Sequence, residues 1–115
     1  MYKEYYDNFL SVFHSLSRKY DKHDVFLDFL KMSSISLSNA FNKNQELEEE
    51  YLRIAKKYTA DALDKIAYLL AQLALMFQHQ NKIEDILGQI YLQESLSNPS
   101  LRTIFHTKSY FSLYE

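Results

Sequence analysis

The longest apolar stretch of the chain, from residue 59 to residue 79, has the periodicity of a helix. Its larger apolar residues recur three or four positions apart, as on one helix face, and do not alternate as in a strand. They are Leu63, Ile66, Leu69, Leu70, Leu73, Met76 and Phe77. No Asp, Glu, Lys or Arg occurs from Ile66 to Asn81, and alanines at positions 60, 67, 71 and 74 line an adjacent face. Neighbouring helices can therefore pack closely on more than one side, and we expect a central helix.

This stretch is too polar to be a membrane span. A span needs about 20 predominantly apolar residues, whereas glutamines and a histidine interrupt this segment and Asp61, Asp64 and Lys65 lie near its start. The N-terminal sequence MYKEYYDNF is charged and aromatic and has no apolar core or cleavage site of a signal peptide. We expect a cytoplasmic protein.

The rest of the composition favours helices as well. One glycine and one proline leave few residues for the tight turns of a hairpin sheet, and the absence of cysteine excludes disulfides and thiolate metal sites. At 115 residues the chain has the length of one domain with a core of its own. We predict a single all-α domain over residues 1–115, a compact bundle of about five to six helices.

Capping signals divide the chain into the expected helices. The first extends to Tyr20, and Asp21 with Asp24 opens a second that reaches Phe41. Asn44 caps a third, whose buried side is expected to include Leu47, Tyr51, Leu52, Ile54, Ala55 and Tyr58. Thr59 caps the central helix, Asn81 with Glu84 opens a fifth, and Asn98-Pro99 starts a short sixth. The serines at positions 33, 34, 36 and 38 are interpreted as close helix packing in preference to a ligand site.

No residue pattern indicates catalysis, a cofactor or a metal. The four histidines lack the spacing of a zinc site, and a single glycine excludes dinucleotide-binding and phosphate-binding glycine motifs. The acidic run Glu48-Glu49-Glu50 opens a helix, where carboxylates are normally solvated. We predict that the protein is not an enzyme.

Two basic clusters are candidates for contact with nucleic acid. Arg18 and Lys19 are followed by Lys22 and His23, and Arg53, Lys56 and Lys57 form the second cluster. The formal net charge of -2 argues against a protein that coats duplex DNA by neutralising many phosphates. An ordinary mixed surface is the favoured interpretation, and DNA contact through Arg18, Lys19, Arg53, Lys56 and Lys57 is the alternative.

Three segments of the chain resemble the N-terminal helical region of N6-adenine DNA methyltransferases from phages and mobile elements. They are DVFLDFLKMSSISLSN at residues 24–39, EEEYLRI at 48–54 with Lys57-Tyr58, and DILGQIY at 85–91. The family pattern reads vF-DF-l-ms-aisiSN, then EEeYl-i-kkY, then DiLG-iym-l-l-N, so the resemblance extends over roughly residues 9 to 107. Three ordered segments at familiar intervals are more specific than any single motif.

The family's catalytic elements have no counterpart in this sequence. Its GQFFTP block, which helps form the S-adenosylmethionine pocket, corresponds to residues 103–108, where only Phe105 and Thr107 match. The only proline, Pro99, does not belong to an Asn/Asp-Pro-Pro-Tyr/Phe motif. The resemblance therefore implies the helical fold, contact with partner subunits and a part in closing around DNA, but no catalytic or cofactor-binding residue, and we predict no binding of S-adenosylmethionine.

The expected function is that of a protein-interaction module of a mobile element that binds a host nucleic-acid enzyme, as anti-restriction and anti-CRISPR inhibitors do. Two alternatives stay open: an accessory DNA-binding subunit of a modification system, and a gene fragment without a function.

The last residues of the chain are the candidate partner-binding segment. Tyr110, Phe111, Leu113 and Tyr114 place four large apolar side chains in six positions. We expect them to fold back on the helices or to be covered by a second copy or a foreign partner, because contiguous apolar patches are rarely left in solvent. Deletion of residues 109–115 distinguishes self-packing, which lowers the melting temperature, from an interface, whose loss abolishes dimerisation or partner binding.

Overall fold

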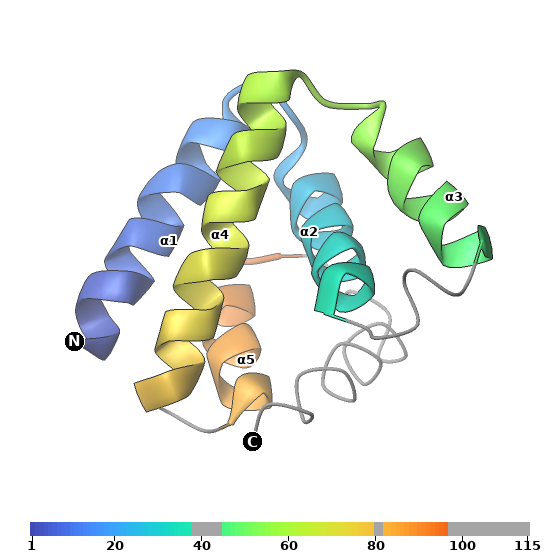
Figure 1. Ribbon diagram of the computed structural model, residues 1–115. Helices are drawn as coiled ribbons and strands as arrows, with labels where there is room; N and C mark the ends of the chain where they lie inside the picture. The colour runs from blue at the N-terminus through green and yellow to red at the C-terminus, as the bar shows by residue number, and fades with distance from the viewer. Residues whose placement is uncertain (38–44, 80–81, 97–115) are drawn as a thin grey trace.

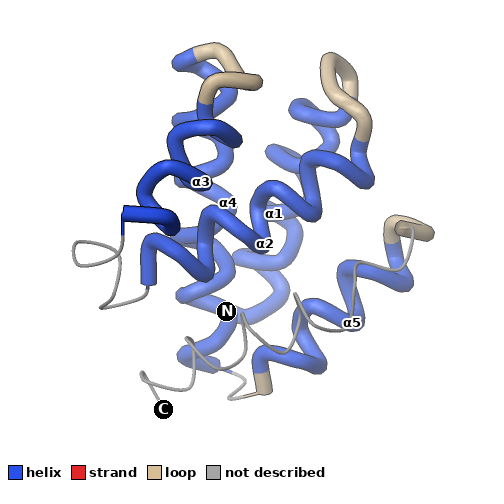
Figure 2. The backbone as a smooth tube through the Cα atoms, turned by 90° about the vertical axis from the view of Figure 1, so that its right-hand side faces the viewer, coloured by secondary structure: helices blue, strands red, loops and turns tan. Residues whose placement is uncertain are grey.

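The computed structural model describes residues 1–37, 45–79 and 82–96, and all regular structure in these ranges is α-helical. The five helices in chain order are α1 (Tyr2–Ser17), α2 (Lys22–Leu37), α3 (Gln45–Ala55), α4 (Ala60–His79) and α5 (Ile83–Gln93). Figure 2 shows helices and loops and no strand in the described part of the chain. The prediction of a compact all-α fold is confirmed. The sixth helix predicted at Asn98-Pro99 lies outside the described residues.

Helix α4 is the longest element and packs along α1, as Figure 1 shows. Near one end of this pair Lys65 Nζ donates a hydrogen bond to Ser15 Oγ over 2.9 Å. Near the other end the ring of Tyr5 stacks on His79, with ring centroids 5.7 Å apart. Helix α4 also contacts α2 and α5, whereas α3 and α5 lie on opposite sides of the molecule in Figures 1 and 2. The predicted central position of this segment is confirmed.

The core between α1 and α2 is built from four phenylalanines. Phe9 meets Phe29 edge to face with centroids 5.4 Å apart, and Phe13 meets Phe26 in the same way at 6.1 Å. Such pairs contribute roughly 0.5–1.5 kcal/mol beyond the area they bury. The fully buried residues of the remaining core come from α2, α4 and α5: Val25, Leu30, Leu69, Leu73, Met76, Ile83, Ile86 and Ile90.

Two predicted helix caps are present, and one predicted helix start is displaced. Asp21 Oδ1 accepts hydrogen bonds from the backbone N–H groups of His23 and Asp24, and Thr59 Oγ1 accepts one from Ala62. Helix α5 instead begins at Ile83, after Lys82, whose side chain forms no cap hydrogen bond. Ile83 is buried, so the start of α5 is stabilised by apolar packing and not by a side-chain cap.

Two predictions about buried faces were wrong. Ala60, Ala67 and Ala71 of α4 are exposed, and the alanine that the core does bury is Ala62. An alanine offers little apolar area, so covering it contributes little to stability. Leu52 of α3 was expected on the buried side and is 51% exposed, because α3 turns a different stripe towards its neighbours.

None of the helices in the described ranges combines the length and the apolar character that crossing a membrane requires.

Candidate functional site

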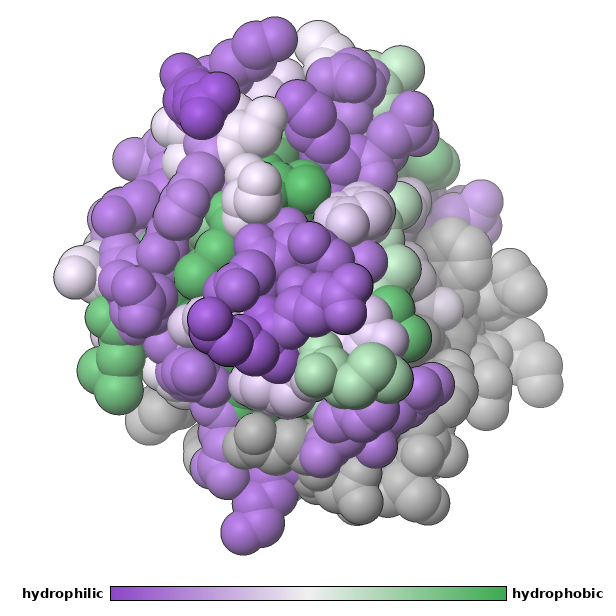
Figure 3. Space-filling model, turned by 90° about the vertical axis from the view of Figure 1, so that its left-hand side faces the viewer, coloured by the Kyte–Doolittle hydropathy of each residue, from purple (hydrophilic) through white to green (hydrophobic). Residues whose placement is uncertain are grey.

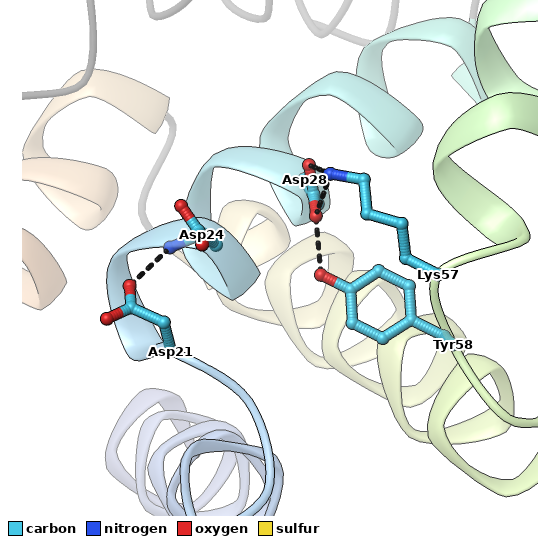
Figure 4. A network of polar contacts seen from close by, with 5 residues as sticks. All are labelled: Asp21, Asp24, Asp28, Lys57 and Tyr58. Atoms are coloured by element: carbon cyan, nitrogen blue, oxygen red, sulfur yellow. Dashed lines mark hydrogen bonds and ion pairs between the residues drawn. The ribbon is translucent and has the colours of Figure 1, made fainter.

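A buried carboxylate joins α2 to the turn between α3 and α4. Asp28 is 4% exposed, and its Oδ2 accepts a hydrogen bond from Tyr58 Oη over 2.5 Å. Lys57 Nζ lies 3.2 Å from Oδ1 and 3.1 Å from Oδ2 of the same carboxylate. Figure 4 shows Lys57 and Tyr58 approaching Asp28 from the α3–α4 turn. Asp28 therefore has both of its oxygens occupied by partners of its own chain.

The environment of Tyr58 keeps its hydroxyl protonated. Burial first, then the hydrogen bond to Asp28 and the negative charge of that carboxylate, raise the pKa of Tyr58 far above its ordinary value. A tyrosine in this state donates a hydrogen bond and does not act as a base at neutral pH. The Asp28–Tyr58 pair is thus suited to holding α2 against the α3–α4 turn.

A second polar cluster attaches α5 to the first two helices. His14 Nε2 lies 2.5 Å from Glu94 Oε1, and Lys22 Nζ donates a hydrogen bond to the Glu94 carbonyl oxygen over 2.7 Å. Closer to the start of α5, Tyr2 Oη donates to Gln89 Oε1 over 2.9 Å. These contacts join residues 72 to 87 positions apart in the sequence, and they position a helix rather than form a pocket.

The candidate DNA-contacting residues of the two basic clusters come together at one end of the molecule. Arg18 and Lys19 lie at the α1–α2 turn, and Arg53, Lys56 and Lys57 lie at the end of α3. All five are exposed, but Lys57 is engaged by Asp28. Figure 1 shows the two turns at the same end of the bundle.

Direct contacts connect these two turns. The backbone N–H of Thr59 donates to Tyr20 Oη over 3.3 Å, and the rings of Tyr20 and Tyr58 lie 4.8 Å apart. Four exposed aspartates share this end of the molecule with the basic groups: Asp21, Asp24, Asp61 and Asp64. The surface at this end therefore carries charges of both signs.

A small pocket of about 120 Å³ lies between α2, α3 and α4. Met32, Ser33 and Ile66, which are all buried, line its inner part, and Ser36 and Ala67, which are exposed, line its mouth. Half-buried side chains complete the wall, among them Tyr51, Leu63 and Leu70. The pocket is mostly apolar, and it opens on the surface of α4 where the alanines are exposed.

The α2 serines differ in their hydrogen bonding. Ser34 Oγ donates to the Leu30 carbonyl oxygen over 2.8 Å, which is the local bond expected of a serine in a helix. Ser33 is 1% exposed, lines the pocket, and its Oγ has no hydrogen-bond partner among the described residues. The local bond therefore accounts for Ser34, whereas Ser33 has a buried hydroxyl without a hydrogen-bond partner among the described residues. The sequence pattern does not distinguish Ser33 from the other serines of α2.

The other predicted features agree with a surface role or lie outside the described residues. Of the predicted solvated run, Glu48 and Glu49 are exposed and Glu50 is half-buried. In residues 1–37, 45–79 and 82–96 no three His, Asp or Glu side chains gather as metal ligands would. The candidate partner-binding residues Tyr110, Phe111, Leu113 and Tyr114 lie outside the described residues.

Comparisons of this chain with protein-family models, with curated proteins and with solved structures found no match. The resemblance to the helical region of adenine DNA methyltransferases therefore stays a prediction from the three sequence segments.

Proposed function

We propose that this protein is a non-catalytic protein-interaction module that resembles the helical region of an adenine DNA methyltransferase and inhibits a host nucleic-acid enzyme. In this proposal it acts in the cytoplasm for a mobile element, as anti-restriction and anti-CRISPR proteins do. The choice of partner class rests on the sequence resemblance. The interaction role rests on one observation, the uncharged exposed face of α4.

This face, which we call the α4 face, consists of Ala67, Tyr68, Ala71 and Gln78. All four are exposed, and no charged residue occurs between Ile66 and His79. Ala67 and Tyr68 are adjacent, Ala71 follows them four and three positions later, and Gln78 follows Ala71 by seven, so the four residues follow one side of the helix for about 17 Å. Figure 3 shows one side of the molecule, where hydrophilic side chains predominate and apolar residues appear in small separate patches. Depletion of charge around an exposed tyrosine is typical of the centre of a protein interface.

The proposal is tested by affinity capture of host proteins from a lysate of the native host. The capture is carried out with the unchanged protein and with variants that carry an added charge, one of them on the α4 face. Ala71→Glu adds a carboxylate at the centre of the face, on an exposed helix position where the fold tolerates it. Gln93→Glu adds the same charge at an exposed position of α5 and is the matched control. We expect the unchanged protein and Gln93→Glu to retain a host nucleic-acid enzyme that Ala71→Glu does not retain.

Equal retention by all three proteins would contradict the assignment of the interface to α4. The absence of any enriched host protein would favour a gene fragment without a function. Melting curves of the two variants verify that the added charge has not unfolded the bundle.

The accessory DNA-binding subunit is the second candidate function. It is favoured by the convergence of Arg18, Lys19, Arg53 and Lys56 at one end of the bundle. The aspartates at the same end weaken it, since they repel the phosphates that those cations attract. Salt-dependent DNA binding distinguishes it from the leading proposal.

A further inference from the structure

Helix α3 is attached to the bundle by little buried apolar surface. Of its 11 residues Ile54 is the buried one, and the helix packs mainly against α2 at the edge of the bundle, as Figure 1 shows. A helix this short is marginal in water on its own, so it persists through the contacts that it makes. Segments with few buried apolar contacts open at a lower free energy than the whole protein does. Helix α3 is therefore suited to opening separately from the other helices.

The turn that follows α3 is held more firmly than the helix itself. Tyr58 is buried, donates a hydrogen bond to Asp28 and packs its ring on Tyr20. The backbone N–H of Thr59 donates to Tyr20 Oη, and Thr59 Oγ1 caps α4. These contacts fix residues 58 and 59 to the α1–α2 turn, to α2 and to α4. A movement of α3 therefore has its pivot between Ala55 and Tyr58.

The space beneath α3 is incompletely filled. The pocket of about 120 Å³ has one wall from α3, made by Tyr51 and Ala55, and its other walls come from α2 and α4. The two α3 residues are half-buried, whereas Met32 of α2 and Ile66 of α4 are buried. Atoms that line such a space lack partners on one side, so this part of the α3 contact contributes less than a close-packed one. Outward movement of α3 removes one wall of the pocket and uncovers the apolar side chains of the other two.

We propose that α3 is a lid, which opens as a unit about residues 56–57 and uncovers the apolar wall that α2 and α4 form beneath it. The anchored turn, with Tyr58 bonded to Asp28, stays in place in both the closed and the open form. A few residues at the end of an element are sufficient for such a hinge. This opening does not depend on the identity of a partner.

Thiol labelling measures the opening, because the sequence contains no cysteine and an introduced cysteine provides a single thiol. Ile54→Cys places this thiol on the buried side of α3. Gln72→Cys is the control and places it in the middle of α4, midway between Lys65 and His79, which both contact α1. Both positions are buried, and Gln72 Oε1 has no hydrogen-bond partner among the described residues that the substitution would remove.

We expect Ile54→Cys to react with a chromogenic disulfide reagent at least about tenfold faster than Gln72→Cys, after division by the rate of each variant in its urea-unfolded form. The rate at Ile54→Cys should also rise less steeply with urea, because opening of the lid exposes less surface than global unfolding does. Equal rates with equal urea slopes would overturn the proposal, since α3 would then open only when the whole protein unfolds.

Tyr58→Phe, added to each cysteine variant, tests the position of the pivot. If the turn stays anchored while α3 opens, loss of the Tyr58 hydrogen bond affects the closed and the open form equally. Labelling at Ile54→Cys should then stay within about twofold. Labelling at Gln72→Cys should accelerate at least about tenfold, because that thiol is exposed by global unfolding. Equal acceleration at both positions would include the turn in the unit that opens and would overturn the proposed pivot.

Met32→Cys repeats the measurement without a change in α3. Met32 is buried on α2 and lines the pocket beneath the lid. Its thiol should show the shallow urea dependence of Ile54→Cys, and its labelling should be equally insensitive to Tyr58→Phe. Labelling with the steep urea dependence of Gln72→Cys would show that movement of α3 does not uncover this wall, and it would contradict the lid.

Discussion

Asp28 is the residue on which the junction of α2 with the α3–α4 turn depends. Its carboxylate is nearly inaccessible to water, and Tyr58 donates to it from a turn 30 positions away. Lys57 is the weaker partner energetically, because its side chain is 55% exposed and water screens its charge. Removal of the hydrogen bond from Tyr58 should therefore lower the free energy of unfolding more than removal of the Lys57 contact.

Tyr58→Phe should lower the free energy of unfolding at neutral pH by roughly 1.5–3 kcal/mol, the cost of losing a buried hydrogen bond to a charged acceptor. Folding raises the pKa of Tyr58. The stabilisation of the folded state by the protonated Tyr58 hydroxyl is therefore complete below the ordinary tyrosine pKa of about 10, and it declines as pH rises above that value. The stability gap between the unchanged protein and Tyr58→Phe should accordingly narrow above about pH 10, by up to roughly 1.4 kcal/mol per pH unit.

Urea denaturation at several pH values measures this gap. Tyr68→Phe removes a hydroxyl from an exposed tyrosine and serves as the control, since it should leave the unfolding midpoint almost unchanged. A gap that stays constant or widens in alkali would contradict the role assigned to Tyr58.

The residues that the sequence did not reveal are those whose role depends on distant partners. Asp28 stands within an apolar run, FLDFL, and that irregularity was the one available signal for a buried carboxylate. Its partner follows only from the geometry of the α3–α4 turn. Ser33 and Ser34 are adjacent serines in the same helix, and the sequence does not indicate which of them bonds to the carbonyl oxygen four residues earlier. Local patterns such as the caps at Asp21 and Thr59 were predictable because donor and acceptor are close in sequence.

At the scale of elements, α3 and α5 are matched in length and unequal in burial. Each has 11 residues. Helix α5 buries four of them, Ile83, Ile86, Leu87 and Ile90, whereas Ile54 is the buried residue of α3. A helix this short is marginal in water without tertiary contacts, so α3 should be the less stable of the two.

Hydrogen exchange under native conditions should therefore show faster exchange for the amides of α3 than for those of α5. The amides of α4, which is central, should be protected at least as well as those of α5. Equal protection of α3 and α4 would show that the contacts of α3 with α2 are stronger than its burial indicates.

The positions of the helices could largely be predicted from sequence, but their faces could not. Periodicity located α4, because a run of 20 residues with apolar spacing has few other solutions. Periodicity predicted that Leu52 and three alanines would be packed, and all four are exposed. Amphipathic spacing shows where the apolar stripe of a helix lies, but it does not show how many neighbouring helices cover that stripe. That number depends on the tertiary arrangement.

At the scale of the whole molecule, the charge distribution predicts weak binding to DNA. Arg18, Lys19, Arg53 and Lys56 can neutralise at most about four phosphates, which corresponds to a slope of log affinity against log salt no steeper than about -3.6. We expect a mobility-shift assay at about 150 mM salt to detect no complex tighter than micromolar. A nanomolar complex under these conditions would favour the accessory DNA-binding subunit instead.

The central claim is that the α4 face inhibits a host nucleic-acid enzyme by covering part of it. The measurement that tests this claim most directly is the activity of the captured enzyme on DNA, titrated with this protein and with its two glutamate variants. The unchanged protein and Gln93→Glu should inhibit at stoichiometric concentration. Ala71→Glu should need at least about tenfold more protein, because it leaves a charge desolvated at the interface. Undiminished enzyme activity in the presence of the unchanged protein, or equal inhibition by Ala71→Glu, would contradict the account.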